Sequence, residues 1–258
     1  MIRIIMVALT VVLFLIFSMP LLGILGARDK KDPEGAQIKS LHIVQGVFRF
    51  ILMLAGVTYE VQGLENIPAD RAVLYVGNHR SYFDILVGYV TVPGLTGFVA
   101  KKEMLKIPLL RDWIHRLNCM FLDRVNINEG SSVLLISFGF QAASTSPVKA
   151  IFSPDISIWI FPEGTRNENK DMTELLPFHE GSLKIAQKSG CPVIPVAITG
   201  TARIFEDHLP FIKPSHVVIR YGEPIDIKEL PPEARKFPGA YTRDVISGML
   251  KDMSEGQE

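Results

Sequence analysis

The sequence predicts an α/β domain, with a mostly parallel sheet flanked by helices, that follows an N-terminal membrane-docking helical hairpin. From residue 59 onward, short β-branched runs alternate with helical stretches, which is typical of parallel strands joined by crossover helices. Residues 1–57 hold two long apolar segments instead. Of the 258 residues, 48% are apolar, which is enough for a sizeable core and excludes intrinsic disorder. We therefore expect membrane-associated helices over residues 1–57 and an α/β domain over residues 58–258.

The charge balance and the cysteine content narrow the function classes. Lys and Arg together number 27, as do Asp and Glu, so no basic excess indicates a nucleic-acid partner. The two cysteines, Cys119 and Cys191, are too few for a disulfide framework. We interpret them as reduced, partly buried thiols of a protein that faces the cytosol.

The first apolar segment covers residues 4–27, which carry no charge. With a rise of about 1.5 Å per residue, a helix of this length would cross a bilayer core of about 30 Å. Pro20, Gly23 and Gly26 are expected to kink or fray its end. A cleaved signal peptide is the alternative, but Leu25-Gly26-Ala27 is a poor cleavage site. We therefore expect an uncleaved membrane segment, and leave open whether it spans the bilayer or is only embedded in it.

Flanking charges predict the orientation of this segment. Arg3 precedes it, whereas four basic residues follow it: Arg28, Lys30, Lys31 and Lys39. Because cytoplasmic flanks are enriched in Lys and Arg, the C-terminal side is expected in the cytoplasm. The localisation predicted from this is a membrane, with the α/β domain on the cytoplasmic face.

The second apolar segment, residues 41–57, follows a polar turn over residues 29–35. It carries His42, Gln45 and Arg49 at positions i, i+3 and i+7, which form one stripe of a helix. We expect an interfacial helix with this stripe toward lipid headgroups. The alternative is an ordinary core helix of the soluble domain.

The α/β domain is predicted element by element from its apolar runs and breakers. The predicted strands are residues 59–62, 72–77, 97–100, 120–122, 157–161, 193–198 and 217–221. The predicted helices are residues 81–89, 109–117, 129–143, 181–189 and 241–253. Residues 144–154 are expected to form a loop, and Pro231, Pro232 and Pro238 mark another before the final helix. Ligands are expected at the carboxyl ends of the strands.

The sharpest motif is Asn78-His79-Arg80-Ser81-Tyr82-Phe83-Asp84, directly after a predicted strand. Ser81 and Asp84 have the spacing of a capping box that starts a helix. In a functional interpretation, Asp84 holds one ring nitrogen of His79 and leaves the other free to take a proton. The amides of the first helical turn would also favour an anion.

The second motif is Phe161-Pro162-Glu163-Gly164-Thr165-Arg166, after another predicted strand. Gly164 permits close backbone approach and Arg166 can grip a phosphate bidentately, although a tight turn with a surface arginine is the alternative. The sequence has no Gly-x-Ser-x-Gly nucleophile turn, because Gly181-Ser182 lacks the second glycine. Direct transfer to a bound hydroxyl is therefore the natural chemistry. The six histidines lack zinc-ligand spacing, so no metal site is expected.

Together the two motifs resemble the glycerolipid acyltransferase family, specifically the 1-acyl-glycerol-3-phosphate (lysophosphatidate) acyltransferases. Two further blocks are similar to those of the family: Phe121-Leu122-Asp123-Arg124 and Val193-Ile194-Pro195-Val196-Ala197-Ile198. Ala100-Lys101-Lys102-Glu103 resembles its basic stretch. The blocks come in family order between residues 59 and 225. One position departs from the pattern, because Asn118 stands where the family's second block opens with glycine.

The resemblance implies a role for each matching residue. His79 would be the general base and Asp84 would orient it. The site for the acceptor's phosphate and glycerol would be formed by Arg124, Glu163, Gly164, Thr165 and Arg166. Because Glu163 is itself an anion, it would orient arginines or a hydroxyl and not touch the phosphate. Lys101 would be a further phosphate ligand, with a solvated surface charge as the alternative.

The implied reaction transfers an acyl chain from acyl-CoA or acyl-carrier protein to the sn-2 hydroxyl of lysophosphatidate in the bilayer. This reaction needs a co-substrate but no cofactor. The same transfer to glycerol-3-phosphate or another lysolipid is the near alternative, and an inactive membrane-binding module is the distant one.

Overall fold

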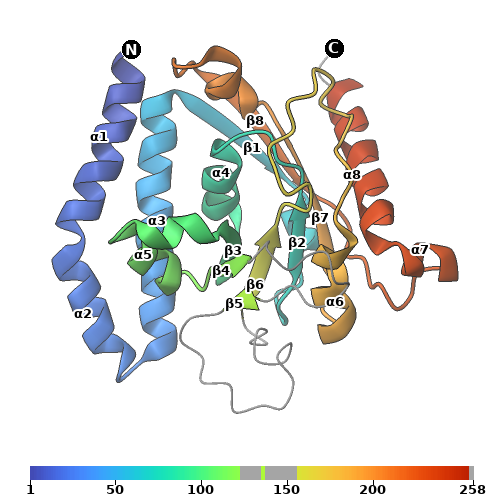
Figure 1. The fold of residues 1–258 in the computed structure, drawn as a ribbon, viewed down its shortest axis with the longest axis horizontal. Helices are drawn as coiled ribbons and strands as arrows, with labels where there is room; N and C mark the ends of the chain where they lie inside the picture. Colours follow the sequence, from blue (N-terminus) through green and yellow to red (C-terminus); the bar gives the residue numbers. More distant parts are fainter. Residues whose placement is uncertain (123–134, 137–155, 256–258) are drawn as a thin grey trace.

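Within residues 1–122, 135–136 and 156–255, which the computed structural model describes, helices cover both faces of an eight-stranded sheet (Figure 1). The strands are β1 (Val57–Gln62), β2 (Leu74–Gly77), β3 (Thr96–Lys101), β4 (Met120–Leu122), β5 (Leu135–Ile136), β6 (Ser157–Ile160), β7 (Val193–Thr199) and β8 (Ser215–Tyr221). The helices are α1 (Ile2–Phe17), α2 (Met19–Asp29), α3 (Pro33–Ala55), α4 (Phe83–Thr91), α5 (Leu110–Arg116), α6 (Lys184–Ser189), α7 (Pro232–Lys236) and α8 (Pro238–Glu255). Short 3-10 turns include η4 (Glu180–Leu183), η5 (Ala202–Ile204) and η6 (Glu206–His208).

The sheet is mostly parallel, as the sequence predicts. Its strand order is β1-β8-β7-β2-β6-β3-β4-β5, and among the described strands the β7–β8 and β4–β5 pairs are antiparallel. The four central strands β7, β2, β6 and β3 run parallel to one another. Their carboxyl ends therefore lie at one edge of the sheet, and the turns that follow them can meet there.

Side chains that alternate along the central strands build a separate core on each face. In β2, Tyr75 packs with Trp159 and the helices α3 and α4, whereas Leu74 and Val76 pack on the side of α6 and α8. The first core is rich in aromatic rings, with the Trp159 ring stacked between Tyr75 at 5.2 Å and Phe98 at 5.1 Å between centroids. The fold thus has three layers, helix, sheet and helix (Figure 1).

The predicted elements of the α/β domain agree with most of the structure. All seven predicted strands are present, and α4, α5 and α8 begin and end within a few residues of the predicted helices. The predicted helix 181–189 is a 3-10 turn followed by α6. The expected loop around the late prolines is largely helical, because Pro232 opens α7 and Pro238 opens α8. Proline is tolerated at the first position of a helix, where a backbone N–H would have no partner within the helix.

The predicted helix 129–143 is wrong where it can be compared. Leu135–Ile136 forms β5, antiparallel to β4, so these residues satisfy their backbone groups on a sheet edge. A short apolar run fits either a strand or a helix, and pairing with β4 decides between them. The rest of this segment and the predicted loop 144–154 lie outside the described residues.

Asn118, the residue in place of the family's glycine, adopts a positive φ of 56°. This left-handed backbone is the conformation that glycine supplies without strain, and asparagine is one of the few other residues that adopt it readily. The substitution therefore keeps the backbone turn that leads from α5 into β4.

The apolar run over residues 4–27 is interrupted next to Pro20, where the sequence predicts a kink. The run breaks at Ser18 into α1 and α2, whose axes are bent by 50°. Pro20 lies in the first turn of α2, where its ring cannot continue the hydrogen bonding of the preceding helix. The Ser18 hydroxyl donates to Leu15 O at 3.0 Å, which further satisfies the backbone at the break.

Helix α5 holds the break from the side of the α/β domain. Trp113 Nε1 donates to the Ser18 hydroxyl at 2.8 Å, and the Trp113 ring packs against Phe14. At the other end of α2, Arg116 forms an ion pair with Asp29 at 2.8 Å. The bent pair α1–α2 is thus tied to the α/β domain by a buried hydrogen bond as well as by apolar packing.

The prediction that His42, Gln45 and Arg49 face lipid headgroups is wrong for Gln45, whereas His42 and Arg49 are exposed. Gln45 is buried and its Nε2 donates to the carbonyls of Tyr89 and Val92, while Arg49 Nη2 donates to Val90 O. These carbonyls lie at the C-terminal end of α4, where the last turn of a helix lacks partners of its own. Gln45 and Arg49 therefore cap α4, and this contact joins one side of α3 to the core.

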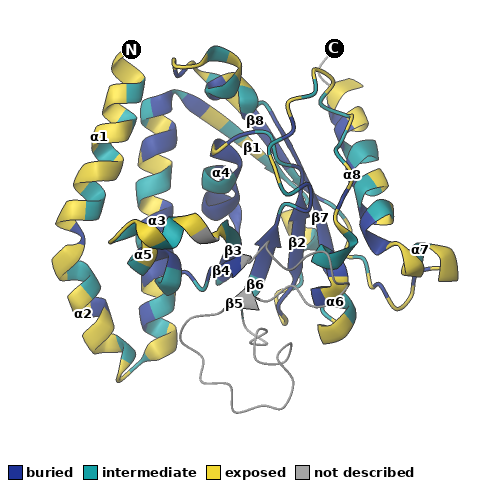
Figure 2. Cartoon of the chain, in the orientation of Figure 1, coloured by how far each residue is buried: buried dark blue, intermediate teal, exposed yellow. Residues whose placement is uncertain are grey.

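Two regions of the N-terminal helices meet the length and apolarity required to cross a membrane. They are α3, with 39% of its apolar window buried in the protein, and the bent pair α1–α2. A buried core helix meets the same criterion, so this is weak evidence by itself. The outward faces of these helices are exposed in Figure 2. Their exposed large apolar residues include Ile2, Ile5, Leu9, Val12, Ile16, Phe17, Ile24, Phe50 and Met53.

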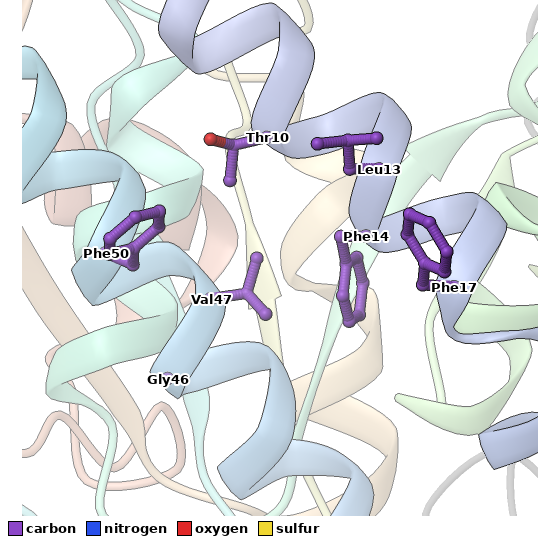
Figure 3. Close-up of a pocket in the computed structure, with 7 residues that line it drawn as sticks. All are labelled: Thr10, Leu13, Phe14, Phe17, Gly46, Val47 and Phe50. Atoms are coloured by element: carbon purple, nitrogen blue, oxygen red, sulfur yellow. The ribbon is translucent and has the colours of Figure 1, made fainter.

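An apolar groove of about 430 Å³ lies between α1 and α3 (Figure 3). Thr10, Leu13, Phe14 and Phe17 line it from α1, and Gly46, Val47 and Phe50 line it from α3. The absence of a side chain at Gly46 leaves room in the groove between the two helices.

We predict that Gln45→Ala destabilises the protein through α4. Two buried carbonyls lose their donor, so the free energy of unfolding should fall by about 1–3 kcal/mol. Urea unfolding of the full chain in detergent, followed by tryptophan fluorescence, measures the change. His42→Ala, on the exposed side of the same helix, is the matched control. Equal unfolding midpoints for the two variants would contradict a capping role for Gln45.

Candidate active site

Two turns at the carboxyl edge of the sheet build the site. One follows β2 and leads through residues 78–82 into α4, and the other follows β6 through residues 161–167. Because β2 and β6 are neighbouring parallel strands, these turns lie side by side. Asn78 anchors the first turn to β7, since its side chain exchanges two hydrogen bonds with the backbone of Ile198.

Asp84 gathers three donors on a single carboxylate oxygen. Its Oδ2 accepts from His79 Nδ1 at 2.9 Å and from the backbone N–H groups of Arg80 at 2.7 Å and Ser81 at 2.8 Å. The Ser81 hydroxyl in turn accepts from Phe83 N, so the side chains of Ser81 and Asp84 both satisfy amides at the start of α4. The Asp84 side chain is 1% exposed. The expected contact between Asp84 and His79 is therefore present, and it is inseparable from the start of the helix.

The imidazole of His79 is oriented by a hydrogen bond at one ring nitrogen and by a stacked ring on one face. A carboxylate can only accept, so Nδ1 donates to Asp84 and Nε2 carries the lone pair. The ring stacks on Phe161 with 4.2 Å between centroids, and the side chain is 16% exposed. His79 thus presents one basic nitrogen in a fixed tautomer, with partial access to solvent.

Glu163 and Asn167 fix the backbone of His79 from the second turn. Glu163 Oε1 accepts from His79 N at 2.8 Å and its Oε2 accepts from Leu176 N at 3.1 Å, while Asn167 N donates to His79 O at 2.7 Å. Glu163 is 4% exposed, and burial raises its pKa, an effect that the two backbone donors oppose. Because both oxygens are engaged by amides, we expect Glu163 to position His79 and not to touch the acceptor.

Arg166 lies at the end of the second turn with its guanidinium held on two sides. Its Cζ stands 4.0 Å from the centroid of the Tyr82 ring, and Nη1 donates to Glu206 Oε1 at 3.2 Å. The side chain remains 32% exposed. Gly164 allows the turn its shape with a φ of 70°, which other residues rarely adopt. The charge of Arg166 is therefore fixed near the start of α4 and accessible.

The expectation that the first amides of α4 are free for an anion is wrong. Asp84 takes the N–H groups of Arg80 and Ser81, the Ser81 hydroxyl takes that of Phe83, and Glu206 takes that of Tyr82 at 2.9 Å. A substrate anion consequently has no amide to bind in this stretch. Any anion bound here would therefore depend on side chains, and that of Arg166 is held beside this stretch.

The structure describes the positions of three of the four remaining predicted site residues. Gly164 and Thr165 share the turn with Arg166, and Thr165 is exposed. Lys101 is the last residue of β3, exposed at the same edge of the sheet but separated from β2 by β6. Arg124 lies outside the described residues.

Sequence reasoning gave no role to three side chains that contact the site: the Phe161 ring under His79, the Tyr82 ring under Arg166, and Glu206 beside both Tyr82 and Arg166. Phe161 and Tyr82 lie within the quoted motifs and could have been found from their places in them. Glu206 belongs to η6, beyond the end of β7, and its one sequence signal is that it follows a predicted strand.

We predict that Glu163→Gln destabilises the protein, because an amide offers one acceptor oxygen where two backbone N–H groups require acceptors. One buried donor is left unpaired, which should cost about 1–3 kcal/mol. Chemical denaturation against the exposed control Glu168→Gln measures this. If Glu163→Gln unfolds at the same denaturant concentration as the control, the carboxylate does not hold the two turns together.

Comparisons with known proteins identify relatives of this chain. The family described as "Acyltransferase" matches residues 58–199. The 1-acyl-sn-glycerol-3-phosphate acyltransferase of Borreliella burgdorferi is 30% identical over 215 residues, 83% of this chain and 76% of that protein. The human 1-acyl-sn-glycerol-3-phosphate acyltransferase alpha is 28% identical over 168 residues, 64% of this chain and 54% of that protein. The matching part thus spans about half the length of these mammalian relatives.

A solved structure matches over nearly the whole chain. The crystal structure of the 1-acyl-sn-glycerophosphate (LPA) acyltransferase PlsC from Thermotoga maritima superposes with a TM-score of 0.71 at 27% identity, covering 98% of each chain. This agreement includes the N-terminal helices as well as the sheet. The family match over more than half of the residues, together with this structural likeness, shows that the chain belongs to the acyltransferase family.

Proposed function

We propose that this protein transfers an acyl group from a thioester donor to the sn-2 hydroxyl of 1-acyl-glycerol-3-phosphate, giving phosphatidate. The observation that carries the proposal is the hydrogen-bonded His79–Asp84 pair in the turn after β2. The neighbouring turn, after β6, carries the accessible guanidinium of Arg166, which is held over Tyr82. A base with an anion-binding group nearby suits an acceptor that is both an alcohol and a phosphate ester. The names of the relatives support the same acceptor.

His79 acts as the general base in this proposal. Nε2 takes the proton of the acceptor hydroxyl as its oxygen attacks the thioester carbonyl, because an alcohol is a poor nucleophile while it keeps that proton. The new C–O bond forms, the C–S bond breaks, and the thiolate leaves with the proton returned from His79. Asp84 stabilises the imidazolium in between. A thiolate is a good leaving group, so a covalent acyl-enzyme is not required.

Arg166 binds the acceptor phosphate in this proposal, aided by Arg124 and with Lys101 as a further cation at the same edge. A guanidinium matches two phosphate oxygens with two parallel N–H donors. Gly164 and Thr165 would line the glycerol moiety. Because a phosphate group alone does not report the number of acyl chains, glycerol-3-phosphate and other lysolipids belong in the acceptor panel.

The N-terminal helices place the site at a bilayer in this proposal. Their outward faces expose many large apolar side chains, far more than single scattered residues on a soluble surface. The basic residues after α1 and α2 favour the cytoplasmic side for the α/β domain. Acceptor and product would then remain in the lipid phase, while acyl-CoA or acyl-carrier protein arrives from the cytoplasm.

We predict that His79→Ala lowers acyl transfer by about 10²–10⁴-fold, the usual contribution of a general base. Release of free thiol from acyl-CoA, with 1-acyl-glycerol-3-phosphate in mixed micelles, measures the rate. The thermal unfolding midpoint should fall only modestly, because Asp84 keeps its two backbone donors at the start of α4 when the ring is lost. His42→Ala serves as the control for a histidine outside the site. Near-normal turnover in His79→Ala would remove His79 from the mechanism, and no transfer by the unaltered chain to any acceptor of the panel would favour an inactive module.

We predict that Arg166→Lys raises the KM for 1-acyl-glycerol-3-phosphate by roughly tenfold, because lysine keeps the charge but loses the two-pronged hydrogen bond. The donor KM should change little, and Arg166→Ala should be worse. Arg243→Lys, a position on α8 that is about as exposed as Arg166 and pairs with Asp244, is the control. A defect confined to the donor KM would assign Arg166 to the phosphates of CoA, and would leave the role of His79 untouched.

A further inference from the structure

Glu206 reaches the site from a third strand. It opens η6, a few residues beyond the carboxyl end of β7, which pairs with β2. Its Oε1 accepts from Tyr82 N at 2.9 Å and from Arg166 Nη1 at 3.2 Å. The Glu206 side chain is 15% exposed, and Oε2 is buried without a hydrogen-bond partner among the described residues. One carboxylate oxygen therefore links the start of α4 to the guanidinium of Arg166.

The guanidinium is constrained on one face and one edge. The Tyr82 ring covers the face and Glu206 takes one N–H of Nη1. Within the described part of the chain, the other N–H groups of Arg166 have no protein acceptor, and the side chain is a third exposed. A long flexible side chain is thus held in place while most of its donors stay available. Such preorganisation lowers the entropy lost when a ligand binds.

We propose that Glu206 is a positioning residue, which holds Arg166 in the orientation that receives the acceptor's phosphate. This inference rests on the proposed function and extends it to a residue outside both motifs. Glu206 acts through Arg166 and does not itself touch the acceptor. The rival role is that of a competing anion, since a carboxylate that accepts from an amide and a guanidinium occupies the partners a phosphate would use. Its burial and its second bond to Tyr82 N fix the carboxylate in place, which favours positioning.

The two roles predict opposite signs. Glu206→Ala removes the acceptor of Nη1 and should raise the KM for 1-acyl-glycerol-3-phosphate by about tenfold, with the donor KM unchanged. Glu206→Gln should keep most of the wild-type value. Both hydrogen bonds use Oε1, and no described donor faces Oε2, so an amide nitrogen can stand there without meeting another N–H. Asp207→Asn, the exposed neighbour on the same turn, is the matched control.

A double-mutant cycle separates positioning from a structural role. If Glu206 works through Arg166, then Arg166→Ala/Glu206→Ala should have no higher acceptor KM than Arg166→Ala alone. Thermal unfolding of every variant accompanies the kinetics, in the same micelles. A structural role would give additive losses, a changed donor KM and a lowered unfolding midpoint that Glu206→Gln does not rescue.

The outcomes distinguish failure of the positioning role of Glu206 from failure of the proposed acyltransferase function. An unaltered chain that acylates 1-acyl-glycerol-3-phosphate, combined with additive losses in the cycle, would overturn the positioning role alone. A lower acceptor KM in both Glu206 variants would also overturn it, in favour of the competing anion. Failure of the unaltered chain to acylate any phosphate-bearing acceptor would overturn the proposed function, and the positioning role with it.

Discussion

The Oδ2 atom of Asp84 accepts hydrogen bonds from the backbone of Arg80 and Ser81 and from the imidazole of His79, and the rest of the site is arranged around it. The two backbone bonds start α4, and the third sets the tautomer of the histidine. A helix cap and an oriented base are usually separate features, but here one buried oxygen provides both. A site of this kind cannot lose the orientation of its base without also fraying a helix of the core.

The parallel sheet brings the other groups to this point from three strands. The turn after β6 supplies Glu163 and Asn167, which engage the amide and the carbonyl of His79, so the residue is fixed in backbone as well as in side chain. The segment after β7 supplies Glu206 beside Arg166. Each contact joins loops far apart in sequence but adjacent in the sheet. The burial of Glu163 is tolerated because two amides satisfy its oxygens.

The sequence predicted those features whose physical cause is local, and missed those that depend on a distant partner. Strands and the two motifs are recognisable because β-branched runs, caps and turn glycines act within a few residues. The bend next to Pro20 has a local cause, but the contact between Ser18 and Trp113, ninety-five positions away, has none, and the burial of Gln45 depends on the carbonyls of α4. The role of Glu206 could not be predicted for the same reason, since no neighbouring residue in the sequence indicates its contact with Arg166. Asn118 is intermediate: its left-handed backbone agrees with the family's glycine, but the identity of the residue alone did not establish it.

The hydrogen bond between Trp113 and Ser18 has a mechanical consequence. An amphiphilic segment joined to an enzyme by a loose linker acts as a tether, which limits how far the enzyme drifts but not how it is turned. The bent helices of this protein are instead clamped to the body at their bend and, through Asp29 and Arg116, at their far end. They therefore form a rigid attachment, which also fixes the orientation of the enzyme. Any surface that holds α1 and α2 also fixes the tilt of the sheet and the height of its carboxyl edge above that surface, so the approach of a lipid to His79 is set by a rigid geometry.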